Sequence, residues 1–129
     1  EIKNINKYNE HRKMLATRYD KILKDLDIQI PFIPDYAEHI FLKYPLLVKD
    51  RNIFLYEAEN NKIEIGDWFI SPIHPTEKNF EFWNYNLGEN PVAEYISAHI
   101  VNLPTHQKVD GNYIDRISHF LKNQKYNLL

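Results

Sequence analysis

The stretch that decides the fold is Gly66-Asp67-Trp68-Phe69-Ile70-Ser71-Pro72-Ile73-His74-Pro75. It continues an apolar run that begins at Ile63, so we expect a strand over residues 63–69. The prolines that follow have a fixed φ and make the next segment a rigid loop. A strand end, a proline-flanked loop and an imidazole together are typical of a pocket wall.

The chain before this stretch opens with a long helix. Apolar residues recur at steps of three, four and seven between Asn4 and Leu26, which predicts an amphipathic helix over that range. The helical pattern starts at once and without an initiator Met, so we expect the chain to begin inside a longer polypeptide. Residues 27–38 contain two prolines and are expected to form an extended connector.

A strand and a short helix should follow the connector. The apolar run over residues 40–48 predicts a buried strand, which Pro45 moves toward a sheet edge because it cannot donate to a ladder. A helix over residues 52–60 comes next, with Asp50 as its N-cap.

Residues 75–90 are expected to form a long loop rich in aromatic side chains. These side chains are Phe80, Phe82, Trp83 and Tyr85. A helix should begin at Pro91 with Asn90 as its N-cap. The side chains expected on its inner face are Val92, Ile96 and Ile100.

The last elements complete an α/β pattern. Residues 101–103 predict a third, very short strand, and a final helix should follow Asp110. The buried stripe of that helix is Ile114, Ile117 and Leu121. The order of elements predicts an α/β fold, a small sandwich in which a short sheet of about three strands is covered by helices.

The composition is that of an ordinary globular domain of 129 residues, 43% hydrophobic and 26% charged. Its net charge of -2 leaves no basic face for nucleic acid or a membrane surface. The sequence has neither a spanning run of roughly 20 apolar residues nor a secretion signal, so we expect a cytoplasmic protein. Zero cysteine excludes disulfides, thiol nucleophiles and thiolate zinc sites.

His74 is the strongest candidate for a functional side chain, because the flanking Pro72 and Pro75 would hold its ring in place. Its imidazole could donate to a phosphate or a sugar hydroxyl. The alternative is a turn histidine whose polar atoms are satisfied by the neighbouring backbone. The residues alone do not decide between the two.

The other candidates are weaker. His106 follows a predicted strand and could face a cleft, although a role at a helix entry explains it better. A metal site would need Asp67, His74 and His106 from separate segments, and no His-x-His or HExxH spacing supports it. With no glycine-rich phosphate loop or nucleophile elbow either, the residues alone indicate a binding or accessory domain.

Four segments, in one order over nearly the whole chain, resemble the C-terminal small domain of the DegT/DnrJ/EryC1/StrS sugar aminotransferases. They are His11-Arg12-Lys13 through Tyr19 and Leu26, Tyr44-Pro45-Leu46-Leu47-Val48 with Arg51, Ile63-Glu64-Ile65-Gly66 through Pro72-Ile73-His74, and Pro91-Val92-Ala93-Glu94 with Asn102-Leu103-Pro104. The chain departs from the family at Trp68-Phe69-Ile70-Ser71, where many members have a His-Tyr-Pro type of sequence. This departure leaves the identity of the sugar open.

The resemblance implies that residues 1–26 are the helix linking the large and small domains, and that residues 27–129 are the small domain. Family members are fold-type I pyridoxal-phosphate enzymes that usually transfer an amino group from glutamate to a keto-sugar attached to a nucleotide. Their cofactor lysine lies in the large domain, and no lysine here matches it. We therefore expect this chain to bind no cofactor and to be catalytically incomplete alone.

The resemblance also implies partners and a site. The partners are the large domain of the same polypeptide, a second copy in a homodimer and the nucleotide-sugar substrate. His74 would contact the substrate while Phe69, Ser71 and Pro72 shape the loop, with no catalytic, cofactor-binding or metal-binding residue in the chain.

Two further points stay open in the sequence. The aromatic residues Phe82, Trp83 and Tyr85 could lie at a subunit interface, and Thr105 and His106 could be local to a subgroup of the family. The second class of function is a stand-alone, non-catalytic binding or assembly domain, because the chain lacks a nucleophile motif and carries an aromatic loop.

Overall fold

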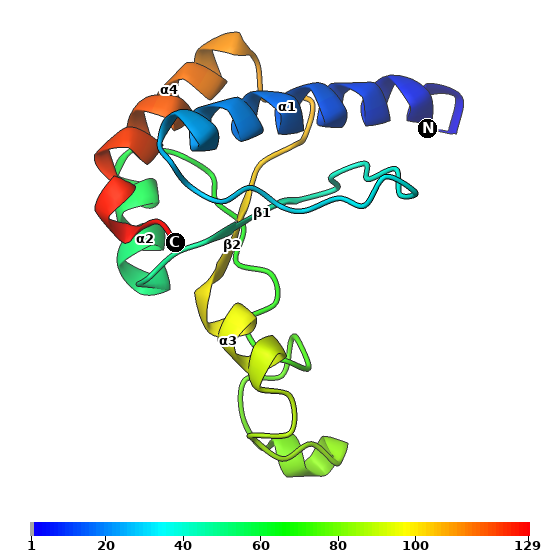
Figure 1. Cartoon of the computed structure of the whole chain (residues 1–129), viewed down its shortest axis with the longest axis vertical. Helices are drawn as coiled ribbons and strands as arrows, with labels where there is room; N and C mark the ends of the chain where they lie inside the picture. Colours follow the sequence, from blue (N-terminus) through cyan, green and yellow to red (C-terminus); the bar gives the residue numbers. More distant parts are fainter. Residues whose placement is uncertain (1) are drawn as a thin grey trace.

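The computed structural model describes residues 2–129 and has two short strands packed among four α-helices (Figure 1). The elements are a 3-10 turn at Ile2–Asn4, α1 (Ile5–Asp25), β1 (Tyr44–Leu47), α2 (Arg51–Asn60), the 3-10 helix η2 (Phe80–Trp83), α3 (Pro91–His99), β2 (Ile100–Leu103), α4 (Gly111–Asn123) and a 3-10 turn at Lys125–Asn127. The predicted α/β class and the long first helix are confirmed. No helix in residues 2–129 is long and apolar enough to cross a membrane.

The two strands pair antiparallel. The register joins Tyr44 to Leu103, Pro45 to Asn102, Leu46 to Val101 and Leu47 to Ile100. Asn102 exchanges both backbone hydrogen bonds with Gly66 on the other side of β2, each at 2.8 Å. Pro45 therefore stands at a position where β1 makes no ladder bond to β2, so its missing N–H is tolerated. The expectation that Pro45 marks a sheet edge is confirmed.

The strand predicted over residues 63–69 is wrong. That segment makes a single β-bridge with β2, and side chains satisfy much of the remaining backbone. The Glu64 N–H donates to the Tyr113 hydroxyl at 2.8 Å, and the Arg51 guanidinium donates to the Asp67 carbonyl at 2.6 Å. Buried or half-buried backbone groups need partners but not a ladder, so the apolar alternation here did not require a third strand.

The core lies where α1 and α4 cover the strand pair (Figure 1). The Tyr19 and Tyr44 rings lie 5.1 Å apart at its centre, and both side chains are fully buried. Tyr19 donates its hydroxyl to the Pro104 carbonyl at 2.7 Å, and Tyr44 donates to the Asp20 carboxylate at 2.6 Å. Burial raises the pKa of both tyrosines, and the bond to Asp20 raises that of Tyr44 further. Both hydroxyls therefore stay protonated and act as donors.

Of the three N-caps predicted from the sequence, the structure contains two. Asp50 accepts from the Ile53 N–H at 2.9 Å and Asp110 from the Tyr113 N–H at 2.8 Å, so both predicted N-caps are confirmed. Asn90 makes no side-chain capping bond to α3, so that prediction is wrong. The predicted stripe of α4 is buried, with Ile114, Ile117 and Leu121 no more than 3% exposed.

Residues 75–99, called the arm below, project away from the core (Figure 1). Ser97 is the buried residue of α3, whereas Val92 is 70% and Ile96 38% exposed. The predicted inner face of this helix is therefore wrong for both, and only Ile100, at the start of β2, is buried as expected. The apolar spacing predicted the helix, but the helix leaves the core, so its apolar side chains remain uncovered.

The arm is held in shape by Glu94. Its carboxylate accepts from the Tyr85 hydroxyl and from the Gly88 N–H, each at 2.7 Å. These two bonds, that of Tyr85 first, hold the pKa of Glu94 below its ordinary value. Tyr85 is buried within the arm itself, while Phe82 is 78% and Trp83 67% exposed. Of the three aromatic residues expected at an interface, two are therefore open for contact.

Candidate functional site

Residues 66–75, called the site loop below, gather three rings. The Trp68 and His74 rings are nearly parallel, with centroids 6.4 Å apart, and the Phe69 and His74 centroids are 5.7 Å apart. Phe69 has a φ of 67°, a left-handed conformation that bulky residues rarely adopt. The backbone therefore turns back at Phe69. Trp68 is 46% and Phe69 49% exposed, so both rings lie partly at the surface.

His74 is exposed at the surface of the site loop. Its Nδ1 accepts from the Ile70 N–H at 3.4 Å, so in the neutral ring the proton sits on Nε2. One ring nitrogen of His74 is thus bonded to the neighbouring backbone, as expected for a histidine with a structural role in the turn. The ring also presents an N–H to the outside, as the functional role requires. His74 can donate one hydrogen bond to a bound molecule.

The other predicted loop residues differ in accessibility. Ser71 is 6% exposed, and its Oγ has no hydrogen-bond partner within residues 2–129. Pro72 is half-buried, and Phe69 stands beside the imidazole. Ser71 therefore packs inside the loop, while Phe69 and His74 form its outer surface.

Side chains from outside the site loop hold it in place. The Arg51 guanidinium donates to the Asp67 carbonyl at 2.6 Å and to the Ser97 carbonyl of α3 at 3.4 Å. The Asn102 amide of β2 donates to the Trp68 carbonyl at 3.4 Å. Arg51 thus ties the site loop to both α2 and the arm.

A groove of 340 Å³ lies between α1 and the site loop. It is lined by Arg12, Leu42, Lys43, Glu64, Ile65, Gly66, Asp67, Trp68, Asn102, Pro104, Thr105 and His106. The Lys43 ammonium stands 4.9 Å from the centroid of the Trp68 ring, a cation–π contact. Trp68 therefore lies close to both Lys43 of the groove and His74 of the site loop.

His106 lies at the groove edge. Its Nδ1 accepts from the Lys108 N–H at 3.3 Å, and its carbonyl is 3.2 Å from Nε2 of His11. Its own Nε2 is buried and lies 3.4 Å from a Glu64 oxygen without forming a hydrogen bond in residues 2–129. Residues 2–129 contain no group of three or more His, Cys, Asp or Glu side chains placed to hold a metal ion. Asp67, His74 and His106 are accordingly not gathered into one cluster.

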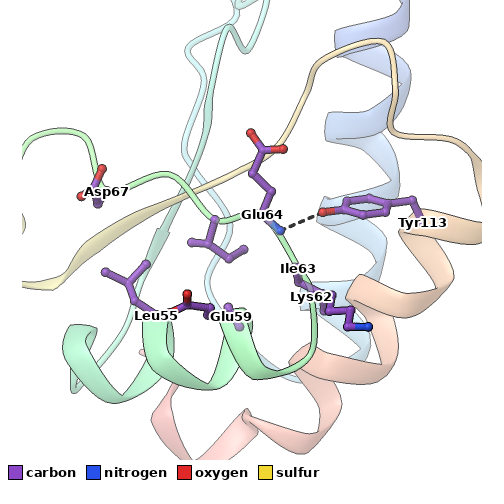
Figure 2. Close-up of a pocket in the computed structure, with 9 residues that line it drawn as sticks. Leu55, Glu59, Lys62, Ile63, Glu64, Asp67 and Tyr113 are labelled. Carbon is purple, nitrogen blue, oxygen red and sulfur yellow. Dashed lines mark hydrogen bonds between the residues drawn. The ribbon is translucent and has the colours of Figure 1, made fainter.

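A larger hollow of 620 Å³ lies on the other side of the 62–67 segment, over α2 (Figure 2). Figure 2 shows the Glu64 N–H bonded to the Tyr113 hydroxyl, while the Glu64 carboxylate points away from α2. The hollow has an apolar floor formed by Leu55, Ala58 and Ile63. It contains neither arginine nor histidine in its lining. The groove on the α1 side offers the richer set of polar groups.

Sequence reasoning missed Arg12 and Lys43 as site residues. Arg12 lies on the same helical face as Tyr8, Leu15 and Tyr19. A charged residue within this otherwise apolar face could have marked Arg12 as a functional candidate. Lys43 had no comparable signal, because only the fold brings it over Trp68.

Comparison with known proteins gives a consistent result. Residues 1–122 match the model of the DegT/DnrJ/EryC1/StrS aminotransferase family. A dTDP-3-amino-3,6-dideoxy-alpha-D-galactopyranose transaminase of Aneurinibacillus thermoaerophilus is 24% identical over 109 residues, 84% of this chain and 29% of the relative. A UDP-N-acetyl-3-dehydro-alpha-D-glucosamine 3-aminotransferase of Acidithiobacillus ferrooxidans is 24% identical over 118 residues, 92% of this chain and 31% of the relative.

A solved structure agrees in fold. The crystal structure of a DegT DnrJ EryC1 StrS aminotransferase from Brucella abortus superposes with a TM-score of 0.77 at 21% identity, over 95% of this chain and 32% of that one. The chain spans about a third of the length of each relative that it matches.

Proposed function

The chain belongs to the DegT/DnrJ/EryC1/StrS aminotransferase family, and we propose that it is the C-terminal small domain of a pyridoxal-phosphate-dependent nucleotide-sugar aminotransferase. In this proposal residues 1–26 link it to the large domain and residues 27–129 form the small domain. The enzyme would transfer an amino group from glutamate to a keto-sugar, and it would act as a homodimer in the cytoplasm. The sugar-nucleotide transaminases among the relatives support this choice of substrate.

The observation that carries the proposal is the arrangement of Trp68, Phe69 and His74. The two aromatic rings lie beside the exposed imidazole, whose Nδ1 accepts from the Ile70 N–H and so leaves Nε2 as the donor. A ring fixed in this way donates a hydrogen bond with little loss of side-chain entropy on binding. Such a group suits a substrate contact, with Ser71 and Pro72 shaping the loop beneath it.

The chain's own residues do not fit pyridoxal phosphate. The cofactor needs a lysine for its aldehyde and a cradle of backbone N–H groups for its phosphate. Lys43 is the lysine of the groove, but it packs over Trp68, and two carboxylates line the same space without a helix N-terminus. We therefore assign the cofactor and its lysine to the rest of the enzyme, where the cofactor would supply the electron sink.

The role of this chain would be to bind and orient. His74 would hold the substrate by donating from Nε2, and the rings beside it would exclude water from that hydrogen bond. Arg51 would keep the site loop at a fixed distance from α2 and the arm.

The test uses the complete reading frame that contains this chain. Borohydride reduction in the presence of pyridoxal phosphate, followed by peptide mass spectrometry, should label a lysine outside residues 1–129. The purified enzyme should also form 2-oxoglutarate from glutamate when a nucleotide-linked keto-sugar is supplied. A label on any lysine of this chain, or no turnover of dTDP- or UDP-linked keto-sugars, would overturn the proposal.

A second candidate is a stand-alone, non-catalytic binding or assembly domain. The exposed rings of Phe82 and Trp83 on the arm favour it, since exposed aromatic groups are common in contact surfaces. Sequencing upstream of Glu1 separates the two candidates. A start codon close to Glu1 favours the assembly domain, whereas a long open frame with a cofactor lysine favours the aminotransferase.

A further inference from the structure

We propose that the groove between α1 and the site loop binds the sugar ring of the substrate and not its diphosphate. The inference rests on the proposed function, because it assigns one part of a nucleotide sugar to one surface of this chain. The residues that carry it are Arg12, Lys43, Glu64, Asp67 and Trp68.

The charges of the groove favour a neutral ligand. Arg12 and Lys43 contribute two positive charges, and Glu64 and Asp67 contribute two negative ones. A diphosphate placed here would meet the two carboxylates as well as the two cations, so it would gain little net attraction. A sugar hydroxyl both donates and accepts, so a polyol can bond to all four side chains at once.

The polar groups needed for this contact are available. Within residues 2–129, neither Arg12 nor Lys43 has a carboxylate within 4.0 Å, and the Asp67 carboxylate makes no hydrogen bond. The Arg12 guanidinium spends one donor on the Asn9 side-chain oxygen at 3.1 Å, and a Glu64 oxygen lies 3.4 Å from Nε2 of His106. The buried amide of Asn102 and the hydroxyl of Thr105 are instead occupied, because each donates to a backbone carbonyl. Lys43 and Asp67 are therefore the charged groups of the groove that no hydrogen bond or ion pair within residues 2–129 occupies.

The apolar lining suits the ring itself. Trp68 is 46% exposed, and Leu42, Ile65 and Pro104 continue the apolar surface around it. The C–H groups of a sugar ring pack against such surfaces while its hydroxyls reach the polar rim. The volume of 340 Å³ lies near the lower end of small-molecule pockets, about 300–1,000 Å³. This space suits one sugar ring better than a whole sugar nucleotide.

Nuclear magnetic resonance of the 129-residue chain tests the assignment, because the indole N–H signals of Trp68 and Trp83 report on the groove and on the arm separately. N-acetylglucosamine and UDP-N-acetylglucosamine should both shift the Trp68 signal and leave Trp83 in place. UDP alone should shift neither. A full shift of Trp68 by UDP alone would assign the groove to the diphosphate, and no shift by either sugar would remove the site altogether.

Variants identify the groups responsible, with saturation transfer to the sugar protons as the readout. We expect Asp67→Asn and Lys43→Met each to weaken binding about tenfold, which corresponds to one charged hydrogen bond. The surface controls Asp25→Asn and Lys122→Met should bind as the parent chain does. Trp68→Phe keeps a flat ring and should bind more tightly than Trp68→Leu. Equal binding by all groove variants and controls would overturn the inference.

These outcomes are distinguishable from a failure of the proposed function. Suppose that the complete enzyme transfers amino groups to nucleotide sugars and that UDP alone shifts the Trp68 signal fully. The proposed function then stands, and the assignment of the groove to the sugar ring is wrong. If the complete enzyme accepts no nucleotide sugar, the proposed function is wrong whatever the groove binds.

Discussion

Arg51 is the side chain whose removal should loosen the site loop most directly. Its guanidinium donates to the Asp67 carbonyl at 2.6 Å, and a hydrogen bond from a charged donor contributes about 1.5–3 kcal/mol. Its bond to Ser97, at 3.4 Å, is too long to add much. The buried Nε has no partner in the described part of the chain, which costs about 1 kcal/mol or more. The net contribution to the free energy of unfolding is about 1 kcal/mol.

The variant Arg51→Met keeps the apolar stem and removes every donor. We expect the free energy of unfolding to fall by about 1 kcal/mol and the melting temperature by about 3–4 °C for a chain of this length. Urea titration measures the first value, and calorimetry measures the second. Arg51→Lys, which can restore one donor, should lose less.

Amide hydrogen exchange gives the local readout for the same variant. Backbone amides of residues 68–74 should exchange faster in Arg51→Met, while those of α4 change only as much as global stability does. Unchanged stability together with unchanged exchange in residues 68–74 would refute the assignment of Arg51 as the anchor of the loop.

Three further perturbations probe the framework around the site. Tyr19→Phe removes a buried hydroxyl that donates to a carbonyl at 2.7 Å and should lower the free energy of unfolding by about 1–2 kcal/mol; the exposed control Tyr56→Phe should be neutral in the same urea titration. Gly66→Ala places a Cβ 3.2 Å from a neighbouring side chain and should cost about 1 kcal/mol, whereas Gly111→Ala faces open space and should not destabilise; equal effects would contradict the close approach at the β-bridge. Because the pKa of Glu94 is lowered from 4.5, its stabilising bonds are complete above that pH and are lost as the pH falls through the lowered pKa. The melting temperature of the parent chain should therefore drop more between neutral and acid pH than that of Glu94→Gln, and parallel curves would exclude this linkage.

The parts of the fold that sequence predicts well depend on local interactions. The stripe of α1, the stripe of α4 and the caps at Asp50 and Asp110 involve residues within a few positions of one another. The strand predicted over residues 63–69 failed because the side chains that bond to its backbone, Tyr113 and Arg51, come from distant helices, and no local sequence pattern indicates those contacts. The inner face of α3 failed for the converse reason, since periodicity marks an apolar side but not whether the core reaches it.

The candidate site also has parts that local sequence predicts and parts that depend on the tertiary fold. The exposure of His74 follows from its place in a loop with prolines on both sides, so the sequence supported it as a candidate. The stacking of Trp68 on His74 depends on the left-handed turn at Phe69, an unusual conformation for a bulky residue. The approach of Lys43 and Arg12 to one groove depends on how α1 and β1 pack, which single-sequence periodicity does not describe.

The central claim is that this chain supplies a substrate-binding wall and leaves the chemistry to the rest of the enzyme. The most direct measurement is steady-state kinetics of His74→Ala in the complete enzyme, with His119→Ala on the exposed side of α4 as the matched control. Loss of one hydrogen bond to substrate should raise KM for the nucleotide sugar roughly tenfold with kcat nearly unchanged, while the control behaves as the parent. An unchanged KM with a lowered melting temperature would contradict the account and make His74 a purely structural residue.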